Sequence, residues 1–411
     1  MTAWRTAVST AAILAVSSPV VVFAQRSVAD VLGRPATPEG APKSYLEELM
    51  LFSYIEDSYV VKFGKQGHGN ANELRFYDHD TGNTFNAAEL SVKKDPSERD
   101  PFGYGIVLTA GIDSQKNHSL GIFRDRDDGA PFFRNTERVD LPEVYASYLI
   151  PLGEGLTLKA GRWATLIGYE VYESPRNLNF SRSFLYTLGT PYTHTGLLAT
   201  YGFTTWFSLT LGFTNGWDSS DNINGYLKPT GSFAFTPMDK LTASVNFHVG
   251  PEQTRAQMHD AVNHRWVVDT VIVYTGIDKV TLALNFDFAG EENDPALVAI
   301  PGRTSRASGW SGVAGYVGYD WTKAFRTVVR AEYFADPQGV RSSETIAPGT
   351  NVELWEITAT AEYTIWRGLV GRLEYRHDEA NRRAFTLGNH GTTPTSHAQD
   401  TLTFALYYSF F

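Results

Sequence analysis

The sequence contains no cysteine and, beyond its first 24 residues, no long apolar run. Without cysteine no disulfide or metal-thiolate site can form, so stability has to come from backbone pairing and burial. A membrane-spanning helix needs about 20 consecutive apolar residues, so none is expected. Basic residues are also few, with 35 Lys and Arg against 45 Asp and Glu. This balance weighs against nucleic acid as a partner.

The first 24 residues have the composition of a secretory signal peptide. Arg5 supplies a positive n-region, Ala7 to Val16 form an apolar core, and Val22-Phe23-Ala24 is a small-residue cleavage site. Residues 25–48 carry Pro, Gly and Thr with little periodicity and are predicted to form a mobile periplasmic leader. The membrane domain is then expected over residues 49–411.

Most of the chain after residue 49 alternates between apolar and polar side chains. Residues 280–288 read VTLALNFDF, which puts Leu282, Leu284 and Phe286 on one face and Asn285 and Asp287 on the other. Residues 207–213 and 241–249 follow the same pattern. One face of each such strand suits lipid and the other suits water, as in a transmembrane β-barrel.

Short and long connections also alternate along the chain. Short links are predicted at 151–155, 204–206, 237–240, 276–279, 322–324 and 366–368, and long ones at 115–140, 166–194, 216–230, 250–264, 290–309, 335–351 and 378–400. Outer-membrane barrels combine short periplasmic turns with long extracellular loops in this way. We therefore predict an all-β fold, a transmembrane antiparallel up-and-down β-barrel of about 16 strands, with 12 to 18 compatible with the pattern.

The last strand favours such a barrel over a soluble β-sandwich, whose strands alternate as well. Residues 401–411 place Leu402, Phe404, Leu406, Tyr408 and Phe410 on the apolar face. An aromatic C-terminal strand is the usual signal for the bacterial barrel-assembly machinery. That machinery and outer-membrane lipid are therefore expected partners.

Ten short segments carry a resemblance to a known family. They are Ala88–Ser91, Tyr145–Leu152, Leu156–Ala164, Gly168–Glu170, Asn179–Leu185, Pro191–Gly196, Asn215–Asp218, Gly250–Gln253, Arg330–Tyr333 and Glu374–Asp378. From about Asn72 to its end the chain resembles the OmpL-like outer-membrane β-barrel porins. The resemblance implies a passive channel and no defined ligand. The family usually stops at Tyr-Ser-Phe, here residues 408–410, and this chain adds Phe411.

One stretch interrupts the alternation. Leu166 to Thr195 mixes Tyr, Phe, Arg, Glu and Asn with two prolines. A long loop of this kind is usually functional or disordered, and its aromatic content argues against disorder. The count of links makes it the third extracellular connection, after about the fifth strand, where general porins fold a loop inward. We predict that it narrows the lumen of the barrel.

Six residues of this loop are candidates for lining a constriction: Tyr169, Glu170, Arg176, Asn177, Asn179 and Arg182. Opposite charges that face each other across a narrow passage would orient polar solutes, and aromatic rings would guide sugar faces. The alternative is that Glu170 and the arginines only tie the loop to the barrel wall.

If the apolar face is outward, the charged strand residues face the lumen. The predicted pore-wall residues are Lys159, Asp287, Arg326, Arg330, Glu332, Glu356, Glu362, Arg372, Glu374 and Arg376. Those of the late strands are expected side by side across neighbouring strands. Two compatible roles follow, namely mutual pairing that holds the wall rigid and a field that acts on passing ions.

No cofactor, metal or catalytic site is predicted. The stretch from Asp218 to Asn224 lacks the closing bidentate carboxylate of a calcium loop, and His259 and His264 form only a weak zinc pattern. A barrel hydrolase with Ser and His on one strand face needs them at i and i+2, and no His in the chain has a Ser at that spacing. A hydrolase of the phospholipase or protease type and a non-conducting structural or adhesin barrel stay as alternatives.

The features together predict a bacterial outer-membrane porin, a passive diffusion channel for small hydrophilic solutes or ions. They do not decide which solute passes, whether cations or anions are preferred, or whether barrels associate as homotrimers.

Overall fold

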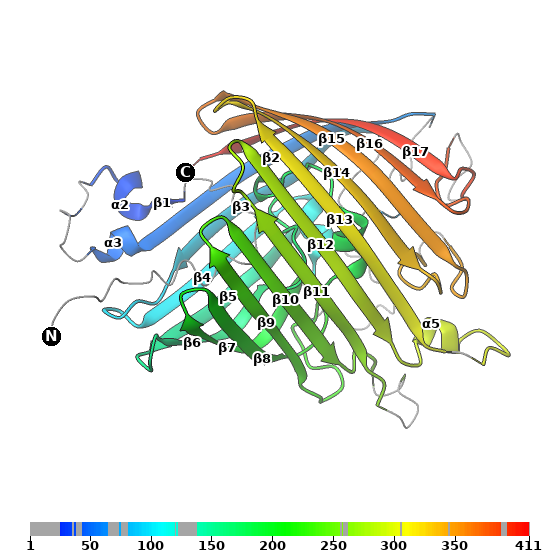
Figure 1. The fold of residues 1–411 in the computed structure, drawn as a ribbon, viewed down its shortest axis with the longest axis horizontal. Coiled ribbons are helices and arrows are strands. Elements are labelled where there is room, and N and C mark those ends of the chain that lie inside the picture. The colour runs from blue at the N-terminus through cyan, green and yellow to red at the C-terminus, as the bar shows by residue number, and fades with distance from the viewer. Residues whose placement is uncertain are drawn as a thin grey trace.

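The computed structural model describes residues 25–34, 37, 43–64, 74, 81–119, 121, 138–254, 257, 262–304, 306–343, 346–387 and 393–410. The predicted signal peptide lies outside these residues. Sixteen antiparallel strands, β2 to β17, form one closed barrel (Figure 1). This agrees with the strand number and fold class predicted from the alternation.

The barrel strands are 8 to 15 residues long, which suits tilted membrane-crossing strands. Their bounds are β2 (Leu49–Lys62), β3 (Gly82–Lys94), β4 (Phe102–Ala110), β5 (Val139–Ile150), β6 (Leu156–Ala164), β7 (Thr193–Thr204), β8 (Phe207–Thr214), β9 (Lys228–Met238), β10 (Leu241–Gly250), β11 (Arg265–Tyr274), β12 (Val280–Glu291), β13 (Ser308–Asp320), β14 (Phe325–Asp336), β15 (Val352–Trp366), β16 (Leu369–Ala380) and β17 (Ala398–Ser409).

The barrel closes where the last strand pairs with the first. The register of β17 with β2 runs from Thr401 opposite Lys62 to Ser409 opposite Tyr54. Beyond that point β1 (Arg26–Ser27) pairs with Met50 and Leu51 of β2. One edge of β2 is paired with β3, so the short strand β1 pairs with the same edge of β2 as β17 does. It covers backbone groups of β2 that would otherwise be unpaired.

Alternation along each strand separates a lipid face from a lumen face. On β12, Phe286 and Phe288 are 46% and 54% exposed on the outside, whereas Asn285 and Asp287, which alternate with them, are buried inside. The predicted direction of the apolar face is therefore confirmed. In the described part of the chain no helix has the length and apolar character needed to cross a membrane.

Part of the predicted leader lies beside the barrel. The helices α2 (Val28–Val31) and α3 (Tyr45–Glu48) stand outside the barrel at the end where the short turns lie (Figure 1). The hydroxyl groups of Tyr45 and Tyr104 lie 2.7 Å apart, which joins α3 to the outer face of β4. The described residues of the leader thus lie against this rim of the barrel.

The links between strands alternate in length as predicted. Short turns such as 151–155 and 239–240 join one end of the barrel, and long loops join the other. The long loops contain α4 (Ile112–Asn117), a 3₁₀ turn η2 (Ser174–Arg176), a π-helical turn η3 (Leu185–Gly189) and α5 (Pro295–Val298). The sequence prediction lacks two further links, residues 63–81 and 95–101, because the alternation in the first strands is weak.

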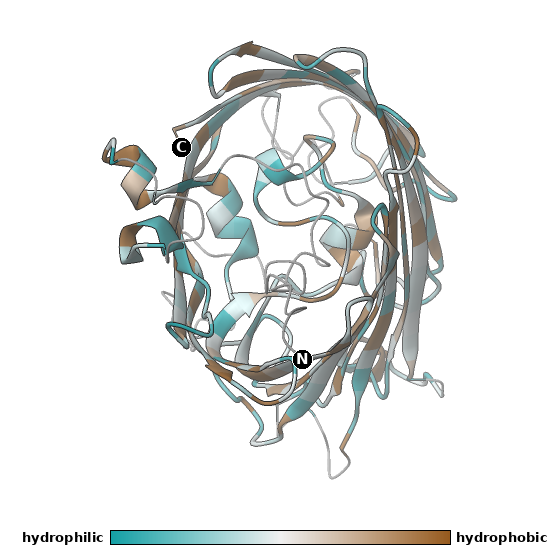
Figure 2. Cartoon of the chain, turned by 60° about the vertical axis from the view of Figure 1, so that its left-hand side comes forward, coloured by the Kyte–Doolittle hydropathy of each residue, from teal (hydrophilic) through white to brown (hydrophobic). Residues whose placement is uncertain are grey.

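Residues 165–192, here called the inner loop, follow the fifth strand of the barrel. Figure 2 shows coil and short helical segments inside the ring of strands. The apolar side chains of the inner loop, including Phe184 and Leu185, pack with Val328 and Phe334 of β14 in one buried cluster. On β13, Gly312 leaves room for this packing, because a Cβ there would lie 2.9 Å from the side chain of Leu185.

Candidate functional site: the inner loop and the lumen wall

The inner loop crosses the lumen between opposite walls. The backbone N–H of Tyr169 donates to Asn285 of β12 at 3.1 Å, and the Tyr169 ring lies 4.6 Å from that of Tyr316 on β13. Three residues later the hydroxyl of Tyr172 donates to Glu143 of β5 at 2.9 Å. Since β13 lies halfway round the ring from β5, this short segment spans the barrel and divides its lumen.

After the crossing, carboxylates of the wall hold the backbone of the inner loop. Glu332 of β14 accepts the N–H groups of Phe184 and Leu185, at 2.6 and 2.5 Å. Glu374 of β16 accepts those of residues 180–181, at 2.8 and 3.0 Å. Each buried carboxylate therefore satisfies two adjacent loop donors. Hydrogen bonds to charged groups contribute about 1.5–3 kcal/mol each, so these two clamps fix the loop firmly.

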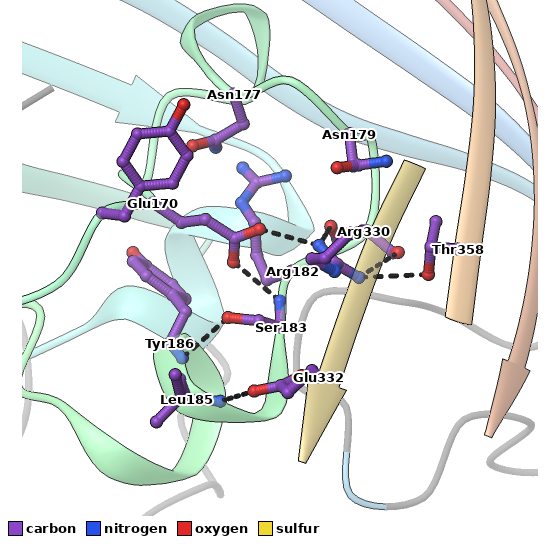
Figure 3. A network of polar contacts seen from close by, with 12 residues as sticks. Glu170, Asn177, Asn179, Arg182, Ser183, Leu185, Tyr186, Arg330, Glu332 and Thr358 are labelled. Atoms are coloured by element: carbon purple, nitrogen blue, oxygen red, sulfur yellow. Dashed lines mark hydrogen bonds and ion pairs between the residues drawn. The ribbon is translucent and has the colours of Figure 1, made fainter. Parts of the chain in front are cut away.

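Arg330 of β14 joins the two ends of this network (Figure 3). Its Nη1 donates to Glu170 at 2.7 Å and to the carbonyl of Ser181 at 2.6 Å, and its Nε donates to Glu356 at 2.6 Å. The guanidinium is fully buried. A buried charge is tolerated only when its donors and its charge are matched, and here loop and wall supply the partners together.

Two further arginines repeat this arrangement on β16. Arg372 donates to the carbonyls of Ser174 and Asn177 at 3.0 and 2.9 Å, and it pairs with Glu362 at 2.7 Å. Arg376 donates to the carbonyl of Arg182 at 2.6 Å and pairs with Asp378 at 2.6 Å. The wall from β14 to β16 is thus occupied by the backbone of the inner loop.

Five of the six predicted constriction residues are buried in this network or within the loop. Asn179 donates to Thr360, Asn177 to the carbonyl of Val171, and Arg182 to the carbonyls of Tyr172 and Phe180. With Tyr169 and Glu170 they are at most 3% exposed. Their contacts favour the alternative in which such residues tie the loop to the barrel wall.

Arg176 differs from the other five. Its side chain keeps 21% of its exposure, pairs with Glu173 at 3.5 Å and lies over the ring of Phe52. A lining role therefore stays a prediction for this residue.

The predicted wall residues fall into two groups by exposure. Arg330, Glu332, Glu356, Arg372, Glu374, Arg376 and Asp287 are buried. Lys159, Arg326 and Glu362 keep partial exposure. Arg326, Glu362 and Arg372 are paired in register across β14, β15 and β16, which is the row of alternating charges expected from neighbouring strands.

The wall opposite the clamp carries mostly small uncharged side chains, with Lys228 and the stacked rings of His194 and His248 at its extracellular end. The inward positions of β7 to β10 include Thr200, Thr210, Ser232 and Ser244, and the hydroxyl groups of Thr200 and Thr210 lie 2.9 Å apart. On β6 next to them, the ammonium group of Lys159 lies 4.3 Å from the ring centre of Tyr145. Thr200, Thr210 and Lys159 keep partial exposure although they face inward, which means that water reaches this side of the lumen.

The sequence does not predict that Asp218 anchors the inner loop. Its carboxylate accepts the N–H groups of Tyr192 and Thr193, at 2.6 and 3.0 Å, where the loop joins β7. Burial raises the pKa of Asp218 to about 6, although these two hydrogen bonds and nearby arginines oppose the shift. The only sequence signal here was the weak calcium pattern.

No group of three or more His, Asp or Glu side chains suited to a metal occurs in the described residues. His264 pairs with Glu292 at 3.3 Å, and His259 lies outside the described part of the chain.

The profile of a family described as "Putative beta-barrel porin-2, OmpL-like" matches residues 49–410. The chain belongs to this OmpL-like porin family. The match covers the whole barrel, so the predicted family is confirmed. A search of curated proteins found no match for this porin.

Solved structures share the fold of this porin at low sequence identity. The outer membrane channel DcaP of Acinetobacter baumannii is 10% identical, with a TM-score of 0.57 over 88% of this chain and 97% of that one. An anion-selective porin from Comamonas acidovorans is 10% identical, with a TM-score of 0.52 over 88% and 99%. OmpT of Vibrio cholerae in a trimer form is 8% identical, with a TM-score of 0.51 over 88% and 99%.

The porin is therefore a channel protein of the bacterial outer membrane, as the sequence predicted. The family is described as one of porins, and two of the similar structures are described as an outer membrane channel and a porin.

Proposed function

We propose that this porin passes small hydrophilic solutes by diffusion along the β6–β10 side of its lumen, and that the inner loop is the constriction. One observation carries the proposal: the segment from Tyr169 to Tyr172 crosses the lumen from β12 and β13 to β5. The rest of the loop is held against β14 to β16, so that side is filled. The water-accessible Thr200, Thr210 and Lys159 lie on the other side.

In this proposal the buried candidates act indirectly. Glu170, Asn179 and Arg182 keep the loop in position, and the passage is bounded by the outer surface of the loop and by the hydroxyl-bearing wall. Hydroxyl groups offer both donors and acceptors, so they replace water around polar solutes without favouring one chemical type. A general channel needs contacts of this weak and uniform kind.

Conductance of the purified porin in planar bilayers tests the proposal. Tyr172→Ala removes the contact with Glu143 and should raise single-channel conductance, because it widens the passage beside the loop. The matched control Tyr274→Ala removes a tyrosine from the outer face of β11, at the last residue of the strand and away from the loop. It should leave conductance unchanged. Absence of conductance in the wild-type porin would refute the channel, and equal conductance in Tyr172→Ala would refute the constriction.

We also propose that three barrels associate as a homotrimer. Support comes from the fold shared with OmpT, which occurs in a trimer form. The same bilayer recordings should then show insertion in groups of three equal conductance steps. Single steps only would contradict the trimer while leaving the channel intact.

We propose further that the barrel has no hydrolase activity of its own. The described inward-facing residues form ion pairs and hydroxyl rows, and the absence of an i, i+2 Ser-His pair supports the same conclusion. Lipase or protease activity of the purified porin that a single serine substitution abolishes would overturn this part.

A further inference from the structure

Two arginines lie on one tryptophan at the extracellular end of the barrel. The guanidinium carbons of Arg265 and Arg341 are 5.3 and 5.5 Å from the ring centre of Trp217. Arg341 also lies 5.0 Å from the ring centre of Trp310, and the two indole rings are edge to face at 6.1 Å. Cation–π contacts of this kind hold guanidinium groups in fixed places without neutralising them.

The four residues come from four different parts of the chain around the same half of the barrel. Arg265 begins β11 and Trp310 lies near the start of β13, whereas Trp217 and Arg341 belong to the loops after β8 and β14. The Nε of Arg341 donates to the carbonyl of Leu188 at 2.5 Å, so the group sits directly on the inner loop. It therefore stands at the extracellular mouth of the proposed passage.

The two guanidinium groups differ in their acidic neighbours: the charges of Glu291 and Glu252 act on Arg265, and that of Asp336 acts on Arg341. Arg265 uses Nε and Nη2 for Glu291, at 2.7 and 2.5 Å. Arg341 pairs with no carboxylate in the described part of the chain, and hydrogen bonds of its Nη groups are likewise absent there. Burial lowers the pKa of Arg341 to about 10 and the like charge of Arg265 adds to the shift, whereas Asp336 and Glu291 oppose it. An anion placed between the two guanidinium groups would relieve this repulsion.

Arginine is the more exposed partner of the Arg265–Glu291 ion pair at this mouth. In Arg265–Glu291 the side chains are 14% and 2% exposed, whereas in the histidine pairs His248–Glu252 and His264–Glu292 the acid is the more exposed partner. Arg265 thus faces water while Glu291 is buried behind it. The opposite order, 21% for Arg326 and 39% for Asp320, occurs at the short-turn end of β13 and β14, on the wall that the inner loop occupies.

We infer that the passage prefers anions and that Arg265 and Arg341 hold the carboxylate or phosphate group of an anionic solute at its extracellular mouth. The inference rests on the proposed function, because it assigns a solute class to the same passage. Arginine suits this role since its planar donors match the oxygens of carboxylate and phosphate groups. Lys159 of β6 then supplies the next positive charge toward the periplasm.

The zero-current potential of the porin in a KCl gradient tests the inference. We expect chloride to pass more easily than potassium in the wild type, and the permeability ratio to fall by about fivefold in R265Q/R341Q, since weak, partly exposed ion contacts are involved. R367Q is the control for charge loss as such, because it removes one positive charge from an exposed turn at the periplasmic end. A preference that R265Q/R341Q retains would overturn the assignment to these two residues.

A second measurement uses citrate and sucrose as probes on the extracellular side. Citrate should interrupt the current in the wild type and in R341K, which keeps the charge, but not in R265Q/R341Q, whereas sucrose should have no such effect in any variant. If R265Q/R341Q does not reach the outer membrane, the comparison of R341K with R341Q decides. A conducting porin that prefers cations or neither ion refutes the inference alone, and a non-conducting one refutes the proposed function with it.

Discussion

Buried charge in this lumen is tolerated because the backbone of a loop completes the pairing. Arg330, Arg372 and Arg376 are at most 1% exposed, and each donates both to a carboxylate and to a loop carbonyl. A buried ion pair repays its desolvation only when further hydrogen bonds satisfy the remaining donors. The carbonyl groups of the inner loop provide those bonds, so loop and wall stabilise each other.

The raised pKa of Asp218 predicts a pH-dependent anchor. Its folded value of about 6 lies above the ordinary value of 3.8, so the folded state binds this proton more tightly than the unfolded state. The contribution of Asp218 to stability is therefore complete below about pH 4 and decreases as the pH rises to about 6. Urea unfolding between these pH values should show the decrease.

Asp218→Asn is the control for this titration. The amide oxygen still accepts from Tyr192 and Thr193 but carries no charge, so the decrease with pH should become smaller. An unchanged pH dependence in Asp218→Asn would assign the effect to another group.

For a single residue, the sequence predicts which side of the barrel wall the side chain faces better than it predicts which group the side chain contacts. The period of two correctly places Arg326, Glu362 and Arg372 on the inside, because successive strand residues must face opposite sides. It could not show that Glu374 accepts from the loop backbone, since a main-chain N–H leaves no mark in the sequence.

Among the elements, the inner loop depends on two carboxylates. E332Q/E374Q keeps the shape of both side chains but removes the charge that faces four backbone N–H groups. Each such bond contributes about 1.5–3 kcal/mol, against about 1 kcal/mol for a neutral one. We expect a loosened loop, seen as larger current noise and higher mean conductance in bilayers.

The barrel itself should be little affected by E332Q/E374Q, because its strand ladder is unchanged. Glu154→Gln, in an exposed short turn, controls for the loss of charge. Quiet channels of wild-type conductance in E332Q/E374Q would mean that the carboxylates do not hold the loop.

The place of the inner loop in the chain was predictable, whereas its path was not. Alternating links correctly set it after the fifth strand. Its crossing from Asn285 to Glu143 depends on which side chains meet once the barrel has closed, and this is a property of three-dimensional packing.

For the whole molecule, closure depends on the pairing of β17 with β2. The N–H of Phe410 donates to the carbonyl of Ser53 at 3.0 Å, and its exposed ring lies 4.9 Å from that of Tyr408. Phe410→Ala should reduce the amount of assembled barrel several-fold while leaving finished barrels stable. The heat-modifiable fraction in outer membranes, measured by electrophoresis, gives this amount.

Phe213→Ala removes an equally exposed aromatic ring from β8, far from the closing strands, and is the control. Equal loss of assembly in both variants would point to lost contact with lipid and not to closure.

The clamp on the inner loop also sets an order of events in time. The loop lies in the first half of the chain, yet its partners Glu332, Glu356 and Glu374 lie on β14 to β16. Contacts between such distant segments form late, because the intervening chain must first be arranged. The loop therefore cannot dock until the last strands are in place, and a nascent barrel passes through a stage with an unobstructed lumen before it acquires its final, narrower form.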